Sequence, residues 1–281
     1  MINCNYVGGE NIDETLRFVN IINEKNGDRG IRLTSIQQRV LNRYDFYLNH
    51  FEEIENMENS IFSIQETDYK NDLKHCYKVG TNTFRIIRGE IFNSQSNQLK
   101  AYCPYCLLNT PTTLDHYIGQ TEFPEFSVLI KNLIPCCYVC NKKKDDIWRN
   151  NNRRRYIHFY NDNFLNNRFL YANLEFNNSD VPNINFELIK PPNLTDYEFE
   201  IISWHFEDLD LRNKYIERSN AILSSEIQII LHSYERGNTI DTIREVVRDK
   251  YIYTTGFGLN YWQNCLYETI SNNIENIINI N

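Results

Sequence analysis

The sequence predicts an α+β protein, in which a mainly helical chain is interrupted by a short cysteine-rich centre containing a few strands. Apolar residues recur at helical spacing towards both ends of the 281 residues, and cysteines, prolines and short apolar runs replace this pattern between Tyr102 and Arg155. We therefore predict three regions: residues 1–99 as a helical region, 100–160 as a compact module, and 161–281 as short strands followed by helices.

The charge is distributed unevenly over these three regions. Residues 1–99 carry 11 Lys and Arg against 14 Asp and Glu, residues 100–160 carry 9 against 5, and residues 161–281 carry 9 against 18, within a net charge of -8. A basic centre thus lies between two acidic flanks. A positive patch of this kind can bind phosphates within a Debye length of about 10 Å. The acidic flanks are better suited to protein contacts or dimerisation.

Composition excludes several classes of protein. The 41% hydrophobic and 14% aromatic content excludes a disordered chain, and the 10 Gly and 7 Pro exclude a fibrous one. No run approaches the roughly 18 apolar residues of a membrane span. The first residues lack the basic and apolar blocks of a signal peptide, so we expect a cytoplasmic protein, without a membrane partner, whose cysteines stay reduced.

Individual helices of the first region follow from periodicity and capping residues. Residues 10–26 predict a helix that ends at Gly27, and Thr34 is expected to cap a second helix that reaches Phe51 and an acidic stretch near residues 52–58. A third helix is predicted over residues 67–92. These three helices would form a small helical unit.

The third region is predicted to begin with two strands and to continue as helices. Residues 168–176 and 183–189 have the pattern of short strands, with the polar residues 177–180 as the turn between them. Pro191 and Pro192 mark a break. Helical periodicity returns over residues 211–234, 239–251 and 259–278.

Two C-x-x-C pairs in the centre predict a structural zinc site. Each pair directs two thiolates towards one point, and two pairs complete a tetrahedral four-cysteine site with no open position for catalysis. The ligands would be Cys103, Cys106, Cys137 and Cys140. The other cysteines are expected to be packing residues: Cys4, Cys76, Cys136 and Cys265.

Between the two pairs lies an Asp-His dipeptide, Asp115-His116, at the end of a β-prone stretch. Adjacent side chains of a strand point to opposite faces, so these two can share one metal–water site only at a strand end or bulge. A surface hydrogen bond is the alternative for such a pair. His158 lies among aromatic residues and is more typical of a core histidine than of a catalytic one.

Taken together, Leu-Asp-His-Tyr-Ile (114–118), Phe-Pro-Glu-Phe-Ser-Val (123–128) and Asn-Leu-Ile-Pro-Cys-Cys-x-x-Cys-Asn-x-x-Lys (132–144) resemble the HNH endonuclease family. The resemblance extends from Cys103 to about Trp148. It implies a ββα-metal fold, with a β-hairpin carrying the Asp-His pair, Asn132 near the second strand, and a helix starting around Cys140.

The resemblance also implies roles for four residues. Asp115 would be the first ligand of a catalytic divalent ion, His116 the general base, and Asn132 the residue that orients it. Asn141 stands where the family often has a histidine ligand, which is a departure from the pattern. An amide oxygen at that position favours a hard cation such as Mg²⁺ or Mn²⁺.

A basic segment follows the second cysteine pair. The segment contains seven cationic residues and two acidic ones, Asp145 and Asp146, so its net charge is +5. The cationic residues are Lys142, Lys143, Lys144, Arg149, Arg153, Arg154 and Arg155. A solvated helix face is the simplest interpretation of such a run. With the family resemblance we expect the segment to hold a nucleic-acid backbone without reading its sequence.

The sequence-based hypothesis is therefore a metal-dependent HNH endonuclease acting on DNA, double-stranded DNA more than RNA. By analogy of architecture, it would act in bacterial anti-phage defence with a regulatory ATPase or sensor protein, and it could form a homo-oligomer. Two alternatives stay open: a freestanding restriction or mobile-element nuclease, and an inactive zinc-stabilised module that binds nucleic acid or protein.

Overall fold

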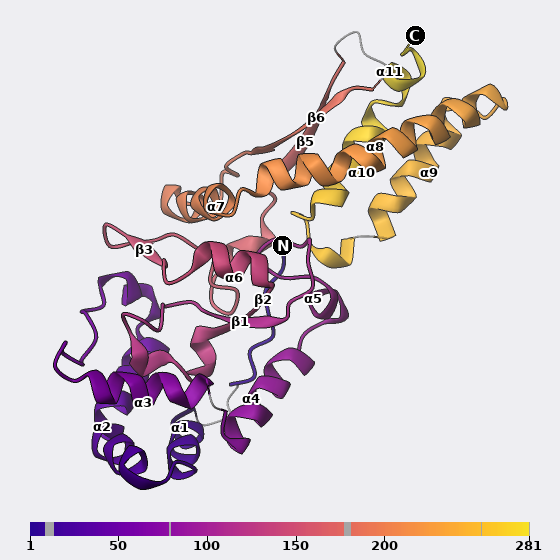
Figure 1. The fold of residues 1–281 in the computed structure, drawn as a ribbon. Coiled ribbons are helices and arrows are strands. Elements are labelled where there is room, and N and C mark those ends of the chain that lie inside the picture. Colours follow the sequence, from indigo (N-terminus) through magenta and orange to yellow (C-terminus); the bar gives the residue numbers. More distant parts are fainter. Residues whose placement is uncertain (9–13, 79, 177–180, 254, 281) are drawn as a thin grey trace. The chain divides into compact units, whose positions relative to one another are not determined.

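The computed structural model describes residues 1–8, 14–78, 80–176, 181–253 and 255–280. Within these ranges it is a mainly helical protein with three small two-stranded antiparallel sheets (Figure 1). The chain forms two compact units, Asn3–Asn161 and Asp162–Asn281, and the second also includes Met1 and Ile2. We call them the N-terminal and C-terminal units. None of the helices in the described ranges is long and apolar enough to cross a membrane.

In the part of the N-terminal unit that the structure describes, the first elements are five helices and a 3-10 turn: α1 (Glu14–Asn23), α2 (Gly27–Asn49), η1 (Phe51–Asn56), α3 (Thr67–Lys78), α4 (Asn82–Asn93) and α5 (Asn97–Ala101). The longest, α2, buries a stripe at helical spacing that consists of Leu33, Ile36, Val40, Tyr44 and Tyr47. This stripe explains why α2 forms the centre of the helical layer, against which α1 and α3 pack.

Three of the predicted helix boundaries in this region are wrong, the first because α1 ends at Asn23 and not at Gly27. Helix α2 begins at Gly27, so Thr34 lies inside it, and its Oγ1 donates to Gly30 O at 2.9 Å instead of capping a helix end. The helix predicted over residues 67–92 is two helices. Thr81 caps the second one by accepting a hydrogen bond from Phe84 N at 3.0 Å, and a cap of this kind marks a helix start.

The cysteine-rich centre folds as a hairpin followed by a short helix. Strands β1 (Thr113–His116) and β2 (Leu133–Cys136) pair antiparallel, with Thr113 opposite Cys136 and His116 opposite Leu133. Between them lie the 3-10 turns η2 (Pro124–Phe126) and η3 (Ile130–Asn132), and after them come α6 (Tyr138–Lys144), β3 (Arg149–Asn150) and β4 (Arg153–Arg154). Helix α6 packs against β1, which gives a ββα arrangement.

The described residues of the C-terminal unit form a hairpin and five helices. Its elements are η4 (Phe164–Asn166), β5 (Leu170–Glu175), β6 (Asn183–Leu188), α7 (Asp196–Asp208), α8 (Leu211–Glu235), α9 (Ile240–Tyr253), η5 (Thr255–Phe257), α10 (Trp262–Asn272) and α11 (Ile274–Ile278). Strands β5 and β6 pair antiparallel, with Leu170 opposite Leu188. The turn predicted over 177–180 lies outside the described residues.

Helix α7 is missing from the sequence-based prediction, although its start carries a clear signal. Thr195 accepts a hydrogen bond from Glu198 N, and the Glu198 side chain accepts one from Thr195 N, which together form a capping box. The helix predicted over residues 259–278 is divided, because α10 ends at Asn272 and α11 follows. The core of this unit includes an aromatic cluster, in which Tyr215 packs against Phe186, Phe206 and Trp262.

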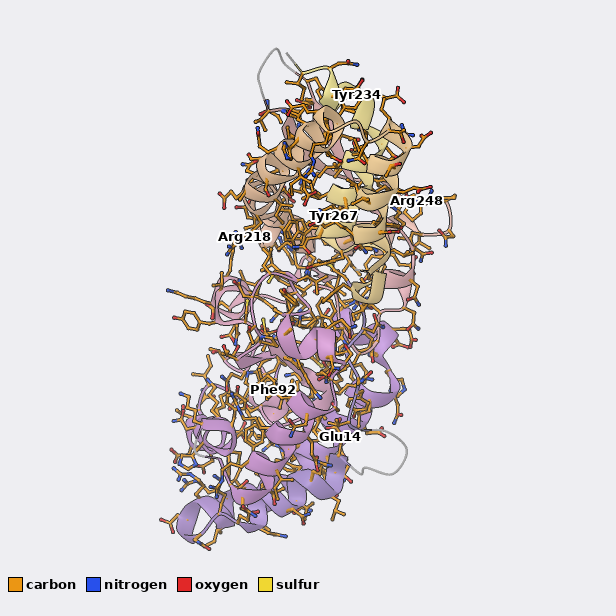
Figure 2. The ribbon with its side chains drawn as sticks, turned by 90° about the vertical axis from the view of Figure 1, so that its right-hand side faces the viewer. Glu14, Phe92, Arg218, Tyr234, Arg248 and Tyr267 are labelled. Atoms are coloured by element: carbon orange, nitrogen blue, oxygen red, sulfur yellow. The ribbon has the colours of Figure 1, made fainter. Side chains whose placement is uncertain are left out.

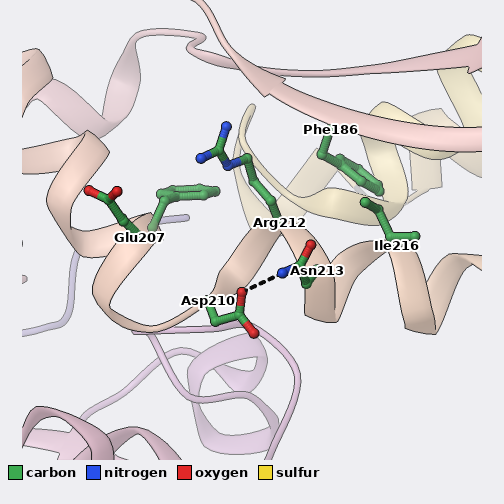
Figure 3. A pocket seen from close by; sticks show the side chains of 7 residues that line it. Phe186, Glu207, Asp210, Arg212, Asn213 and Ile216 are labelled. Atoms are coloured by element: carbon green, nitrogen blue, oxygen red, sulfur yellow. Dashed lines mark hydrogen bonds between the residues drawn. The ribbon is translucent and has the colours of Figure 1, made fainter.

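A cavity of about 270 Å³ opens in the C-terminal unit beside the start of α8 (Figure 3). Asp210 and Asn213 form part of its wall and are joined by a hydrogen bond of 2.7 Å from Asn213 Nδ2 to Asp210 Oδ1. The Arg212 side chain lies between Glu207 and Phe186 in the same view. No residue that lines this cavity is a site residue predicted from the sequence, and all of the predicted site residues lie in the N-terminal unit.

Candidate metal centre and the Asp115–His116 site

Four cysteines from the two C-x-x-C pairs converge in the N-terminal unit. The sulfur atoms of Cys103, Cys106, Cys137 and Cys140 all lie within 4.8 Å of one another, and the four side chains are buried. Four sulfurs bound tetrahedrally at about 2.3 Å from zinc would be roughly 3.8 Å apart. These four cysteines could therefore hold a metal ion such as zinc.

The backbone at each cysteine pair forms the turn that brings its two sulfurs together. After α5, Leu107 N donates to Cys103 O at 2.7 Å, and Leu107 adopts a left-handed backbone conformation with φ of 51°. At the other pair, Cys137 is the N-terminal cap of α6, and Cys140 N lies 3.5 Å from the Cys137 sulfur. Both turns are local, which explains why spacing alone was enough to predict them.

The other cysteines are buried without belonging to this group of four. Cys136, on β2, lies close, with its sulfur 3.9 Å from that of Cys103. Cys4, Cys76 and Cys265 lie elsewhere, and burial raises the pKa of Cys76 and of Cys265 to about 12. These two thiols are consequently protonated at neutral pH and behave as small apolar side chains.

Asp115 is buried on β1 and has two close partners. Its Oδ2 accepts a hydrogen bond of 2.6 Å from the Tyr105 hydroxyl, and Lys144 Nζ lies 3.2 Å from each carboxylate oxygen. Tyr105 stands inside the first C-x-x-C pair, so the turn of that pair positions this contact. Sequence reasoning missed this contact of Tyr105, although its place between two candidate metal-ligating cysteines was a usable signal.

Lys144 is the clearest departure from the expected site. It was predicted to bind phosphate, but its side chain has no exposed surface, and its Nζ also donates to His116 O at 2.8 Å. The rings of Tyr117 and Tyr156 lie 6.0 and 5.6 Å from the same nitrogen. The physical reason is the helical period, which turns the last residue of α6 towards β1.

His116 contacts different residues from those around Asp115. It is the last residue of β1, its Nε2 lies 2.9 Å from Ser127 O, and its ring meets the edge of Tyr77 at 4.5 Å. A carbonyl only accepts, so Nε2 carries the proton in the neutral ring and the lone pair is on Nδ1. Burial lowers the pKa of His116, against a smaller opposing effect of Asp115, and favours this neutral form.

Asn132 holds the loop that follows His116. Its Oδ1 accepts from Ile118 N at 2.7 Å and from the Tyr47 hydroxyl at 3.2 Å, and its Nδ2 donates to Ile118 O and Phe126 O. The side chain is buried. Asn132 thus fixes the backbone at Ile118, two residues after His116, and these hydrogen bonds go to the loop rather than to the His116 ring that Asn132 was predicted to orient.

Asn141 lies on α6 and faces β1. Its Nδ2 donates to Thr113 Oγ1 at 2.9 Å and to Leu114 O at 3.3 Å. Close approach between the loop after β1 and the end of α6 depends on Gly119, because a Cβ there would lie 2.6 Å from Asp146 Cβ. The structure therefore brings the helix and the strand of the predicted site together, with Asn141 beside the two residues that precede Asp115.

Glu14 connects the segment just before β2 to the first helix of the chain. Sequence reasoning did not identify this residue. From the first turn of α1 (Figure 2), its carboxylate accepts hydrogen bonds from Ile130 N at 2.7 Å and Lys131 N at 3.0 Å, and from the Tyr6 hydroxyl. The side chain is only 5% exposed, and burial raises its pKa. No local pattern could have shown a partner more than a hundred residues away.

The predicted basic segment divides into exposed and buried cations. Lys142, Lys143 and Arg153 are exposed, and Arg155 is partly exposed. Arg149 is held by Glu55 O and Met57 O at 2.9 and 2.8 Å, while Arg154 is 7% exposed and lies over the Phe51 ring. Like Lys144, these two side chains are committed to contacts within the unit, so the expected seven-residue phosphate surface is smaller than predicted.

His158 is a core residue. It has no exposed surface, its Nε2 lies 3.2 Å from the Tyr47 hydroxyl, and the rings of Phe51 and Tyr117 are each 4.5 Å away. Burial lowers the pKa of His158 well below its ordinary value, with further lowering by Lys131 and Arg154. His158 contacts Tyr47, and Tyr47 contacts Asn132. His158 therefore helps to support the loop that Asn132 holds.

No family model matches the chain, and no solved structure matches it. The chain is similar to Protein ea31 of Escherichia phage lambda, with 28% identity over 184 residues. The aligned part covers 60% of this chain and 61% of the phage protein, so the chain spans about three fifths of the length of the relative that it matches. The name of that protein states no activity.

Proposed function

We propose that this protein is a metal-dependent endonuclease of the HNH type that hydrolyses phosphodiester bonds in DNA. One observation carries the proposal: the β1–β2 hairpin and α6, joined at the four-cysteine centre, bring together an Asp-His pair, an Asn that holds the following loop, and a second Asn on the helix. Asp115, His116 and Asn132 stand in the order of the family motif, and Asn141 takes the place where that motif often has a histidine.

The four cysteines would hold zinc as a structural ion, because four thiolates leave no ligand position for substrate or water. The catalytic ion would be held at Asp115 and Asn141. The oxygen atoms at Asp115 fit a cation, since the Lys144 ammonium lies within 3.2 Å of both carboxylate oxygens and 2.8 Å from His116 O. Oxygen donors of this kind suit Mg²⁺ or Mn²⁺.

His116 would act as the general base. The neutral ring accepts a proton from water at Nδ1, while Nε2–H stays bonded to Ser127 O and fixes the ring plane. Asn132 keeps the backbone after His116 in place, and Lys142, Lys143 and Arg153 would contact phosphates on the outside of the site. A bound divalent ion would stabilise charge on the phosphate and on the leaving oxygen.

The test is nicking of supercoiled plasmid by the zinc-loaded protein with and without added Mg²⁺ or Mn²⁺. We expect His116→Gln to lower the nicking rate by at least about 100-fold, because a positioned general base contributes that much. The glutamine keeps a polar group near Ser127 O, so the melting temperature of the variant should stay close to that of the wild type. His50→Gln, at an exposed histidine, is the matched control. Wild-type nicking by His116→Gln would exclude the assigned role.

A second candidate is an inactive binding module, and the buried pair between Asp115 and Lys144 favours it, since a carboxylate already neutralised has less need of a metal. Such a protein would bind DNA equally well with His116→Gln and would cut under no divalent ion. The similarity to a protein of Escherichia phage lambda supports another alternative, a nuclease of a mobile genetic element.

A partner protein remains part of the proposal for the C-terminal region. Residues 161–281 carry 18 Asp and Glu against 9 Lys and Arg, so this region suits a protein surface better than nucleic acid. Co-purification of the full chain with a regulatory ATPase or sensor would support a role in anti-phage defence. Nicking at full rate by the chain alone would favour the freestanding nuclease.

A further inference from the structure

Lys144 and Asp115 form an ion pair that is shielded from bulk solvent. Neither side chain is more than 1% exposed. The ammonium lies near four oxygen atoms, two from the Asp115 carboxylate, the His116 O and, at 3.5 Å, the Asp145 O, with the rings of Tyr117 and Tyr156 6.0 and 5.6 Å away. Lys143, one residue earlier on the same helix, is exposed. The two neighbouring lysines of α6 therefore have different environments and cannot have the same role.

The oxygen set around Lys144 Nζ has the composition of a site for a hard cation. Carboxylate and backbone carbonyl oxygens are the ligands that Mg²⁺ and Mn²⁺ prefer. An ammonium and a divalent ion cannot occupy one such site together, because like charges a few ångströms apart in a buried environment repel strongly. The two cations are thus alternatives at Asp115.

We propose that the Lys144 ammonium is an internal cation that competes with the divalent ion for Asp115, so that metal binds only when Lys144 withdraws. This inference rests on the proposed function, because it assumes that Asp115 is a metal ligand. The resting protein then has a neutralised carboxylate and a low affinity for metal, which keeps the nuclease inactive at low divalent-ion concentration. A binding step that must first break an ion pair is weakened by the free energy of that pair.

The first experiment measures Mn²⁺ affinity of the zinc-loaded full chain by electron paramagnetic resonance of free Mn²⁺. We expect Lys144→Gln and Lys144→Met to bind Mn²⁺ at least about tenfold more tightly than the wild type, because the competitor is gone. Lys143→Gln removes the same charge from the exposed face of α6 and should leave the affinity within about twofold. Asp115→Asn reports which part of the binding depends on the carboxylate.

The outcomes separate this inference from the proposed function. If the wild type binds Mn²⁺ through Asp115 and the Lys144 variants bind it equally or more weakly, competition is excluded while a metal-dependent nuclease stands. If neither the wild type nor the Lys144 variants show binding that Asp115→Asn abolishes, Asp115 is no metal ligand, and both proposals are overturned.

A second measurement uses the wild type and avoids any effect of substitution on folding. Acetylation of lysines followed by peptide mass spectrometry should modify Lys142 and Lys143 readily and Lys144 slowly in the absence of divalent ions. Saturating Mn²⁺ should increase the labelling of Lys144 severalfold and leave the other two unchanged. Equal protection of Lys144 with and without bound Mn²⁺ would show that the ammonium does not withdraw.

Discussion

Histidines show most clearly how burial decides the behaviour of a single residue in this protein. His116 and His158 are both buried, and burial lowers the pKa of each, but their neighbours differ. His116 lies at the end of a strand beside Asp115, whereas His158 is enclosed by Tyr47, Phe51 and other aromatic rings. His116 is a candidate base because it lies beside a carboxylate and at a chain reversal. An imidazole ring alone would not make it one.

The lowered pKa of His158 predicts a pH dependence of stability. The folded state keeps His158 neutral, while the unfolded chain takes up a proton below about pH 6.5, so acid favours unfolding. Stability from this group is complete above that pH and falls by up to about 1.4 kcal/mol per pH unit below it. We expect urea titrations of His158→Gln to show a shallower loss of stability between about pH 7 and 5.

The control for this prediction is His232→Gln, which alters a histidine on α8 whose side chain is 69% exposed. This variant should retain the pH dependence of the wild type. An identical slope for His158→Gln and the wild type would mean that His158 does not resist protonation in the folded state.

Secondary-structure elements were predictable where the signal is local. The turns of the two C-x-x-C pairs and the start of α7 each depend on residues fewer than five positions apart. The cysteine turns were predicted from the sequence, whereas the start of α7 was not. The division of residues 67–92 into α3 and α4 was mispredicted because apolar periodicity continues across the Thr81 cap. Periodicity reports a buried face, and it does not report where a helix stops.

At the site itself, the sequence indicated the residues but not their contacts. The order of Asp115, His116, Asn132 and Asn141 is readable from a motif, and the structure brings the elements that carry them together. The burial of Lys144 and Arg154 was not readable, since a run of cations gives no sign of which side chains turn inward. Contacts such as that of Glu14 with Ile130 depend on folding over long sequence separations.

The four-cysteine centre predicts opposite results for two adjacent cysteines. Cys137→Ser should lose the metal and destabilise the N-terminal unit by several kcal/mol, because structural zinc binding is coupled to folding. Cys136→Ser, next to it but outside the group of four, should retain about one zinc per chain. Elemental analysis and circular dichroism of both variants provide the measurement, and zinc-free wild-type protein that is well folded would contradict the assignment.

At the scale of the whole molecule, the distribution of charge predicts which surface of this acidic protein would bind DNA. Replacing the exposed Lys142, Lys143 and Arg153 with Ala should weaken binding to all sequences alike and reduce the salt dependence by about 0.9 in log–log slope for each phosphate contact removed. The measurement is a salt titration of binding to duplex DNA by fluorescence anisotropy.

A second triple substitution, with the same change in net charge, serves as the control. Arg212, Arg218 and Arg236 are exposed on or beside α8, where Arg218 is visible in Figure 2. Their replacement should leave the slope unchanged if DNA contacts only the N-terminal unit. Equal slopes for both triple variants and the wild type would remove the basic segment from DNA binding and favour a partner that supplies it.

The hydrogen bonds from Ile130 and Lys131 to Glu14 have a consequence for protein engineering. A fragment cut from Cys103 to Trp148 would contain the whole recognisable motif but would leave these two backbone amides without their acceptor, next to Asn132. Transplanting that fragment into another scaffold should therefore give a metal-binding peptide with a disordered loop. The compact unit from Asn3 to Asn161 contains both the motif and Glu14, so we expect a transplant of that unit to keep the loop ordered.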